Sequence, residues 1–319
     1  MSTGEKLIQM VIAIALFFAI VAAILLLTQR FRSRRGELVQ AAGFVLPATI
    51  LIALGLLYPA IKTIYLSFRD SYSTKFVGLD NYKTIFTSKA ELTVLGNTAM
   101  WVIITPIAAT LIGLVYAVLV DHARMERLAK ALIFLPMAIS LVGASIIWKF
   151  VYDPRIGLLD AITGKVGLGS DHVWYANPSA HPWNNIWLIV ILIWVQTGFA
   201  MTVLSAAIKA IPTDIVEAAR LDGVGGFKMF RYITVPSIRP TVVVVLTTIT
   251  ITTLKAFDII QTISAGGAYH TSVLAYEFYF QAFKAFNSGL SAALAVLIFV
   301  LVLPIVIYNV RQMRKADAR

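Results

Sequence analysis

Seven apolar stretches of membrane-spanning length dominate this sequence of 319 residues. About 20 apolar residues are needed for a helix, which rises 1.5 Å per residue, to cross the hydrocarbon of a bilayer. Lipid offers a backbone no hydrogen-bond partners, so each stretch is expected to be helical. The predicted spans are Leu7–Leu27, Ala42–Leu66, Val94–Val120, Ala131–Val151, Ile186–Ile208, Thr241–Ile263 and Leu290–Tyr308. The sequence therefore predicts an all-α, polytopic membrane protein with about seven transmembrane helices.

Composition agrees with a membrane protein and narrows its chemistry. Hydrophobic residues make up 59% of the chain and charged residues 13%, whereas soluble domains carry about 25% charged residues. The chain has no cysteine, which excludes disulfides and thiolate metal sites. It also lacks a G-x-x-x-x-G-K-[ST] loop and an H-E-x-x-H motif. We therefore expect no catalytic residues, no cofactor and no metal in this chain, and no ATP hydrolysis by it alone.

The basic residues are distributed unevenly between the predicted loops. If the segment Arg30–Arg35 is cytoplasmic, 16 of the 27 Lys and Arg residues lie on that side and 8 on the other. Cytoplasmic loops of membrane proteins carry an excess of Lys and Arg, so the N-terminus is expected outside and the C-terminus in the cytoplasm. The net charge of +11 is thereby explained by topology, without a nucleic-acid partner.

One loop on the basic side differs from the others because a short helix is detached from the spans. Pro212 is expected to end the preceding helix, Thr213 or Asp214 to cap a helix of about nine residues, and Gly223 to follow its C-terminus. Two alanines on one face leave room for another protein surface, whereas a helix lying on lipid favours bulkier apolar residues. The predicted face consists of Ile215, Ala218, Ala219 and Asp222.

This loop resembles the E-A-A loop of ATP-binding-cassette importer permeases. The matching positions are Glu217-Ala218-Ala219, Gly223, Ile233 and Val235-Pro236, with Val235 where the pattern usually has Leu. In that family the loop forms a coupling helix that docks in a cleft of a separate ATPase subunit. The resemblance implies this role for Glu217, Ala218, Ala219, Asp222 and Gly223.

Two further segments are similar to carbohydrate-uptake permeases of the maltose type. The first is Gly78–Tyr82, which matches G-L-x-N-[YF]. The second is Phe257–Gly267, and it is followed by Ala268 where the family usually has proline. The resemblance covers roughly residues 40–310. It implies that residues 1–40 are an extra N-terminal helix with a basic cytoplasmic segment. Residues 41–319 are then a six-helix importer core whose coupling loop lies at about 209–239.

The same resemblance implies the chain's partners and location. Such permeases work with a second, homologous permease and two ATPase subunits, which bind ATP and Mg. An extracytoplasmic binding protein delivers the sugar, here an α-glucoside or another oligosaccharide. The chain is expected in the lipid of a bacterial cytoplasmic (inner) membrane.

A sugar path needs polar groups that match hydroxyls and aromatic faces for stacking. The spans flanking the coupling loop are the candidates, with Gln196 and Phe199 in one and several threonines in the other. The hydroxyl of a threonine in a membrane helix often bonds to a carbonyl of its own helix. Such a threonine need not contact sugar. The predicted pathway residues are Gln196, Phe199, Thr250 and Thr253.

Three other classes of function remain open from the residues alone. A secondary transporter would need acids within the membrane, and only Asp258 lies well inside a predicted span, with Lys255 expected on the same helical face. A membrane-embedded glycosyl or lipid transferase would need clustered acids or a metal motif. A receptor or scaffold would show no ATPase stimulated by substrate.

Overall fold

The computed structural model describes residues 4–5, 8–12, 15, 18–19, 22, 42, 45–121, 125–167, 172–264 and 266–317, with side chains as far as 312. Helices account for nearly all regular structure in these residues, beside one isolated β-bridge between Arg69 and Phe76. The chain divides into two compact units, Met1–Tyr65 and Leu66–Arg319. The all-α prediction is confirmed.

The first unit contains most of the helix Val45–Leu66, which matches the predicted span Ala42–Leu66. It includes a π-helical turn, η1 (Ala53–Leu57), followed by α3 (Tyr58–Leu66). Among the described residues, no side chain of this helix is buried, as expected for a helix whose neighbours are lipid or another protein. The predicted span Leu7–Leu27 lies largely outside the described residues and stays a prediction.

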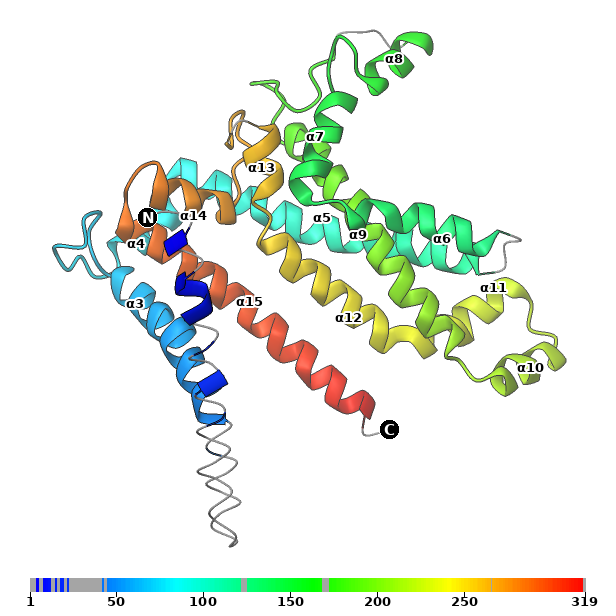
Figure 1. Ribbon diagram of the computed structural model, residues 1–319. Coiled ribbons are helices and arrows are strands. Elements are labelled where there is room, and N and C mark those ends of the chain that lie inside the picture. Colours follow the sequence, from blue (N-terminus) through cyan, green and yellow to red (C-terminus); the bar gives the residue numbers. More distant parts are fainter. Residues whose placement is uncertain are drawn as a thin grey trace, which may run out of the picture. The chain divides into compact units, whose positions relative to one another are not determined.

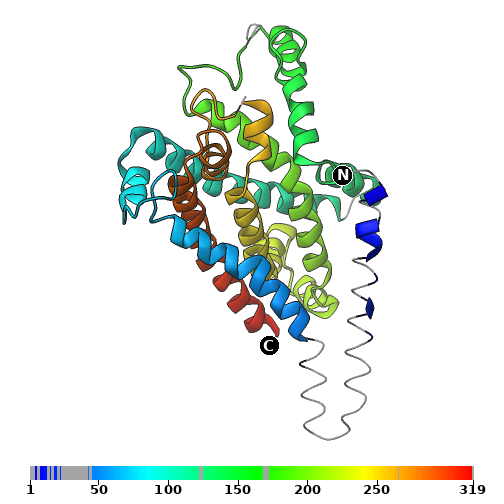
Figure 2. The same ribbon diagram turned by 60° about the vertical axis from the view of Figure 1, so that its left-hand side comes forward.

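The second unit is built around long helices joined by shorter ones (Figure 1). Its elements are α4 (Asp80–Thr87), α5 (Lys89–Val120), α6 (Glu126–Phe134), η2 (Leu135–Ala138), α7 (Leu141–Val151), α8 (Leu158–Lys165), α9 (Trp183–Lys209), α10 (Thr213–Leu221), α11 (Gly226–Met229), η3 (Phe230–Thr234), α12 (Val235–Leu254), α13 (Asp258–Ile263), α14 (Leu274–Phe283) and α15 (Ser288–Asp317). The most extensive packing is between α5 and α9, and α12 packs on both. Figure 2 shows α15 beside α12.

The predicted span Ala131–Val151 is wrong as a single helix. In the structure, Glu126–Ala138 and Leu141–Val151 meet at an angle of 102°. Pro136 lacks a backbone N–H and cannot continue the helical ladder. The Ser140 hydroxyl then accepts a hydrogen bond from the N–H of Gly143 at 3.1 Å and starts a new helix. The apolar stretch is therefore a broken span or a re-entrant segment.

The predicted span Thr241–Ile263 is also wrong in its ends. A continuous helical segment runs from Gly226 to Leu254, and α13 is a separate helix. The N–H groups of Lys255 and Ala256 bond to carbonyls three residues earlier, which closes α12. Lys255 stays exposed while Ala256 enters the core. Since Asp258 begins the next helix, it does not share a helical face with Lys255 as predicted.

The remaining spans agree with the prediction apart from their length. The helices Lys89–Val120, Trp183–Lys209 and Ser288–Gln312 each include the predicted stretch. Within the described part of the chain, five helices are long and apolar enough to cross a membrane, or six if the bent pair counts as one span. The total of seven stays a prediction.

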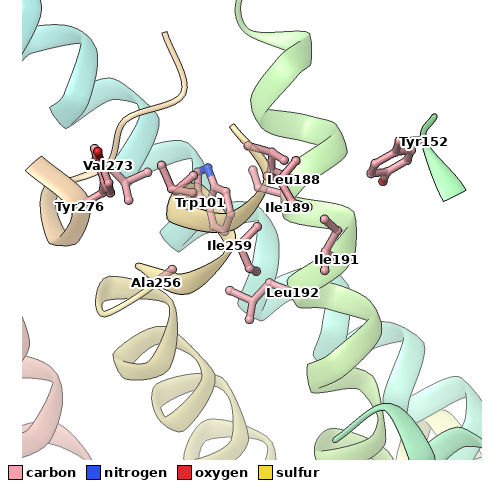
Figure 3. Packing of buried hydrophobic residues seen from close by; sticks show 12 residues of the cluster. Trp101, Tyr152, Leu188, Ile189, Ile191, Leu192, Ala256, Ile259, Val273 and Tyr276 are labelled. Atoms are coloured by element: carbon pink, nitrogen blue, oxygen red, sulfur yellow. The ribbon is translucent and has the colours of Figure 1, made fainter. Parts of the chain in front are cut away.

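The largest buried cluster joins α5, α9, α13 and the start of α14. Figure 3 shows Trp101 of α5 among Leu188, Ile189 and Leu192 of α9, with Ile259 of α13 beside them. A second cluster, around Met201 and Ile249, joins α5, α9 and α12. The two clusters hold α9 at the centre of the second unit, so α9 is a rigid support for the polar residues that it carries.

Candidate functional site

The short helix α10 is formed between α9 and α11 as the loop sequence predicts. It spans the nine residues Thr213–Leu221. Its N-cap is Pro212, with no side-chain cap hydrogen bond, so the predicted capping by Thr213 or Asp214 is wrong. Both residues already lie inside the helix, because the proline's fixed φ suits the residue that starts it.

The C-terminus of α10 explains why glycine is at position 223. Gly223 has a φ of +75°, a conformation that costs a non-glycine residue energy. Its N–H donates to the carbonyl of Arg220, and the N–H of Val224 donates to that of Ala219, each at 3.0 Å. These two bonds form a Schellman motif, which satisfies the last carbonyls of the helix and turns the chain sharply.

Glu217 and Ala218 of α10 are exposed, as is Asp222 directly after it, but Ala219 is only 7% exposed and packs on its own chain. The predicted face of Ile215, Ala218, Ala219 and Asp222 is therefore not one free surface. Sequence reasoning also missed two apolar side chains in this loop. Leu221 is 90% exposed and Phe227 is 80% exposed. Apolar side chains of this size are available to another protein or to the lipid surface.

The pathway prediction can be compared with a hollow of about 320 Å³ beside α9 and α12. Gln196 and Phe199 line it together with Thr248 and Thr252. Thr250 and Thr253 do not line it. Their hydroxyls donate to the carbonyls of Leu246 and Ile249, each at 2.8 Å, within α12. The hollow's remaining wall comes from the α6–α7 break and α9: Met137, Ile139, Leu141, Leu192 and Val195.

Gly198 lets α6 approach α9 closely. A Cβ on Gly198 would lie 2.7 Å from the carbonyl oxygen of Ile133 and 3.0 Å from Phe134 Cα. Real Cβ atoms do not approach backbone so closely, so only glycine permits this contact between α9 and α6. Ile133 lines a different hollow, together with Trp194 and Thr197, so this contact fixes α6 on α9 and does not form a wall of the hollow beside Gln196.

A buried polar network lies at the opposite end of α5 and α9. The Asn97 amide donates to the carbonyls of His270 at 2.7 Å and Ser272 at 2.8 Å. Its oxygen lies 3.0 Å from His181 Nε2 and accepts from Asn185 at 3.2 Å. Trp101 donates to Asn185 at 3.0 Å. Sequence reasoning missed this network, although asparagines at the edges of apolar stretches signal buried polar contacts.

Charged side chains at the ends of three helices pair with one another. Asp121, Glu126, Lys130 and Lys209 form an ion network at the ends of α5, α6 and α9. Among the residues whose placement is described, no group of three or more His, Cys, Asp or Glu could hold a metal ion. The geometry offers an exposed short helix, a mainly apolar hollow that Gln196 lines, and a charge network at the ends of α5, α6 and α9.

Known proteins share this fold and much of this sequence. A family model described as "Binding-protein-dependent transport system inner membrane component" matches residues 109–315. The osmoprotective compounds uptake permease protein GgtC of Synechocystis sp. is 43% identical over 280 residues, covering 86% of this chain and 99% of the relative. The alpha-glucoside transport system permease protein AglF of Rhizobium meliloti is 43% identical over 277 residues, covering 84% and 80%.

A solved structure agrees with the fold of this chain. It is a bacterial alginate ABC transporter in complex with an alginate pentasaccharide-bound periplasmic protein. One of its chains aligns with a TM-score of 0.75 at 22% identity, covering 89% of this chain and 96% of that chain. The family match includes α9, α10 and α12, the elements that carry the loop and the hollow. The chain belongs to the family of binding-protein-dependent transport system inner membrane components.

Proposed function

We propose that this chain is a permease subunit of an ATP-driven importer and translocates a sugar, an α-glucoside or a related oligosaccharide, across the cytoplasmic membrane. Its family supplies transport components rather than enzymes. The sugar class is supported by the 43% identity to AglF, an alpha-glucoside permease by name. An extracytoplasmic binding protein delivers the sugar, in keeping with the family's description.

The observation that carries the proposal is α10. A nine-residue helix lies between α9 and the Gly226–Leu254 helix, with Glu217 exposed and a glycine-dependent turn at its end. Its charged and apolar exposed residues suit a cleft in another protein. We assign Glu217, Ala218, Asp222 and Gly223 to docking of an ATPase subunit, with Ala219 supporting α10 from its buried side. ATP and Mg are bound by that subunit.

The hollow beside Gln196 is the proposed sugar path. A glutamine amide both donates and accepts hydrogen bonds, which matches sugar hydroxyls. The ring of Phe199 adds an apolar face on which a pyranose can stack. Both residues lie on α9, whose end leads into α10. Movement of α10 by the ATPase would therefore be transmitted directly to the side chains that contact sugar. Thr250 and Thr253 remain candidates for another state of the path.

The topology and assembly complete the proposal. The bias of basic residues places the N-terminus outside and the C-terminus in the cytoplasm. Residues 1–40 form an additional membrane anchor, and residues 41–319 form the importer core. A second homologous permease completes the translocation path, and two ATPase subunits bind the paired coupling helices. Lipid covers the exposed apolar side chains of the outer helices.

The experiment is uptake by proteoliposomes that contain the co-expressed permeases and ATPases, with the binding protein outside. Maltose, sucrose and trehalose are offered separately. We expect at least one of them to accumulate only with internal ATP and to stimulate ATP hydrolysis. Uptake driven by an ion gradient without ATP would instead identify a secondary transporter and contradict the proposal.

A further inference from the structure

A network of charged side chains joins the adjacent ends of α5, α6 and α9. Asp121, the residue after α5, has a side chain that is only 5% exposed. Its Oδ1 accepts hydrogen bonds from Lys130 of α6 and, at 2.7 Å, from Ser205 of α9. Glu126 accepts from Lys130 at 2.9 Å and from Lys209 at the end of α9. The network ties three helix ends together immediately before α10.

The second carboxylate oxygen of Asp121 is not used by this network. Oδ2 is buried and has no hydrogen-bond partner among the residues that the structure describes. Lys130 cannot supply one, because its three donors go to Asp121 Oδ1, Glu126 and Ser205. A buried carboxylate oxygen without a donor is costly and uncommon in folded proteins. The present arrangement thus leaves a strong acceptor open.

An unused donor lies on the same cavity wall. Asp121 and Arg220 of α10 both line a hollow of about 380 Å³, together with Val118, Ile208 and Met229. Arg220 is exposed, and its guanidinium makes no ion pair or side-chain hydrogen bond with the residues that the structure describes. A guanidinium matches a carboxylate geometrically and stays charged at all relevant pH values. The hollow is the space through which the two groups could meet.

We propose that Asp121 and Arg220 form an exchangeable ion pair that transmits the movement of α10 to the ends of α5, α6 and α9. The pair is open in the arrangement seen here. When the ATPase moves α10, Arg220 enters the hollow and donates to Asp121 Oδ2, which fixes the coupling helix to the network. Asp121 is therefore a positioning residue, since its contacts are with other side chains. The inference rests on the proposed role of α10 as a coupling helix.

The test is a double-mutant cycle in the complete transporter. Asp121→Asn, Arg220→Gln and the double variant are reconstituted with the partner permease, the ATPases and the binding protein, and maltose, sucrose and trehalose are supplied in turn. The measured quantity is sugar transported per ATP hydrolysed. Each single variant should lower this ratio by about fivefold or more, a usual size for coupling between sites. The double variant should be no worse than the poorer single variant.

Two further variants separate charge pairing from a general structural effect. Arg220→Lys keeps the charge and should recover part of the ratio. Arg311→Gln makes the same exchange at an exposed arginine of α15, outside both the hollow and the coupling loop, and should leave the ratio unchanged. If the fold-losses of the two single variants multiply in the double variant, the two residues act independently and the proposed ion pair is wrong. An unchanged ratio in either single variant would also contradict it.

Co-purification of the ATPase distinguishes this inference from the proposed function. We expect every variant to retain the ATPase. If Arg220→Gln loses it, Arg220 belongs to the docking surface, and the exchangeable pair is overturned while the coupling role of α10 stands. If the unaltered complex transports sugar without ATP, the proposed function itself fails, and this inference fails with it.

Discussion

Gly113 of α5 lies so close to Ala200 of α9 that a Cβ on Gly113 would be 2.6 Å from the Cβ of Ala200. It would also be 2.8 Å from the backbone nitrogen of Met201. α5 and α9, the pair of helices with the most extensive packing, therefore cross at a distance that only glycine permits. In lipid, helices gain little from the hydrophobic effect and depend on such close van der Waals packing.

The substitution Gly113→Ala should therefore destabilise the α5–α9 crossing. Overpacking of this kind typically costs about 1–3 kcal/mol, because the backbones must separate. A lower midpoint of thermal unfolding in detergent would report the loss. Gly96→Ala is the matched control on α5, since nothing lies within 4 Å of the added Cβ. Equal midpoints for the two variants would show that the close crossing does not limit stability.

Asn97→Ala should loosen the segment 266–273 that follows α13. The variant leaves the carbonyl of Ser272 without its donor, and the carbonyl of His270 keeps only the longer bond from the Asn185 amide at 3.2 Å. Each buried group left unpaired costs about 1–3 kcal/mol. Hydrogen exchange in this segment should rise. Thr93→Ala is the control on the same helix, because the Thr93 hydroxyl bonds only to its own helix, at Lys89. Unchanged exchange in Asn97→Ala would contradict the network's role.

Gln196→Ala should lower sugar uptake without lowering the yield of complex. Losing one hydrogen bond to a sugar is worth about 1 kcal/mol, or roughly fivefold in transport rate at limiting sugar. Gln261→Ala, at an exposed glutamine of α13, should leave uptake unchanged. Comparing Thr248→Val with Thr250→Val identifies the face of α12 that meets sugar, and the hollow favours Thr248. Normal uptake by Gln196→Ala would reject the path at this hollow.

The turn that follows α3 should open at low pH. The Asp70 carboxylate accepts from the N–H groups of Thr74 at 2.6 Å and Lys75 at 3.0 Å. These bonds, led by that from Lys75, lower the pKa of Asp70 below its ordinary value of 3.8. A depressed pKa stabilises the folded turn above pH 3.8, and the effect is lost as the pH falls through the folded pKa.

The measurement is hydrogen exchange at Thr74 and Lys75, corrected for intrinsic rates, between pH 7 and pH 3. Protection should fall below about pH 4 in the unaltered protein. In Asp70→Asn, protection should be lower at pH 7 and independent of pH over this range. A pH dependence that survives in Asp70→Asn would assign the opening to another group.

The sequence predicted those features of the fold that depend on residues close together in the chain. Apolar runs located the long helices, and Pro212 with Gly223 bounded α10, because helix stops act through the backbone of a few neighbouring residues. The breaks near Pro136 and Lys255 were missed, since an apolar run looks the same whether it is straight or bent. Hydropathy averages over a window, whereas a break depends on single caps such as Ser140.

The site was predictable only where residues close in sequence act together. Glu217 and Gly223 lie on one short loop, so their spacing could be recognised. Asp121 and Ser205 meet across 84 residues, and no local pattern indicates that contact. Gln196 was singled out because an amide within an apolar span is unusual, and its role in the path stays a prediction. The sequence does not tell which threonines of α12 face the hollow, because that depends on how α12 packs against its neighbours.

The central claim is that α10 binds an ATPase subunit through Glu217. The most direct measurement is co-purification of the ATPase with Glu217→Lys in mild detergent. Lys165→Glu is the control, since it reverses an exposed charge on α8, at the other end of the second unit from α10 (Figure 1). We predict that Glu217→Lys yields a folded permease without ATPase and without uptake, while the control retains both. A Glu217→Lys complex that keeps its ATPase and transports sugar normally would contradict the claim.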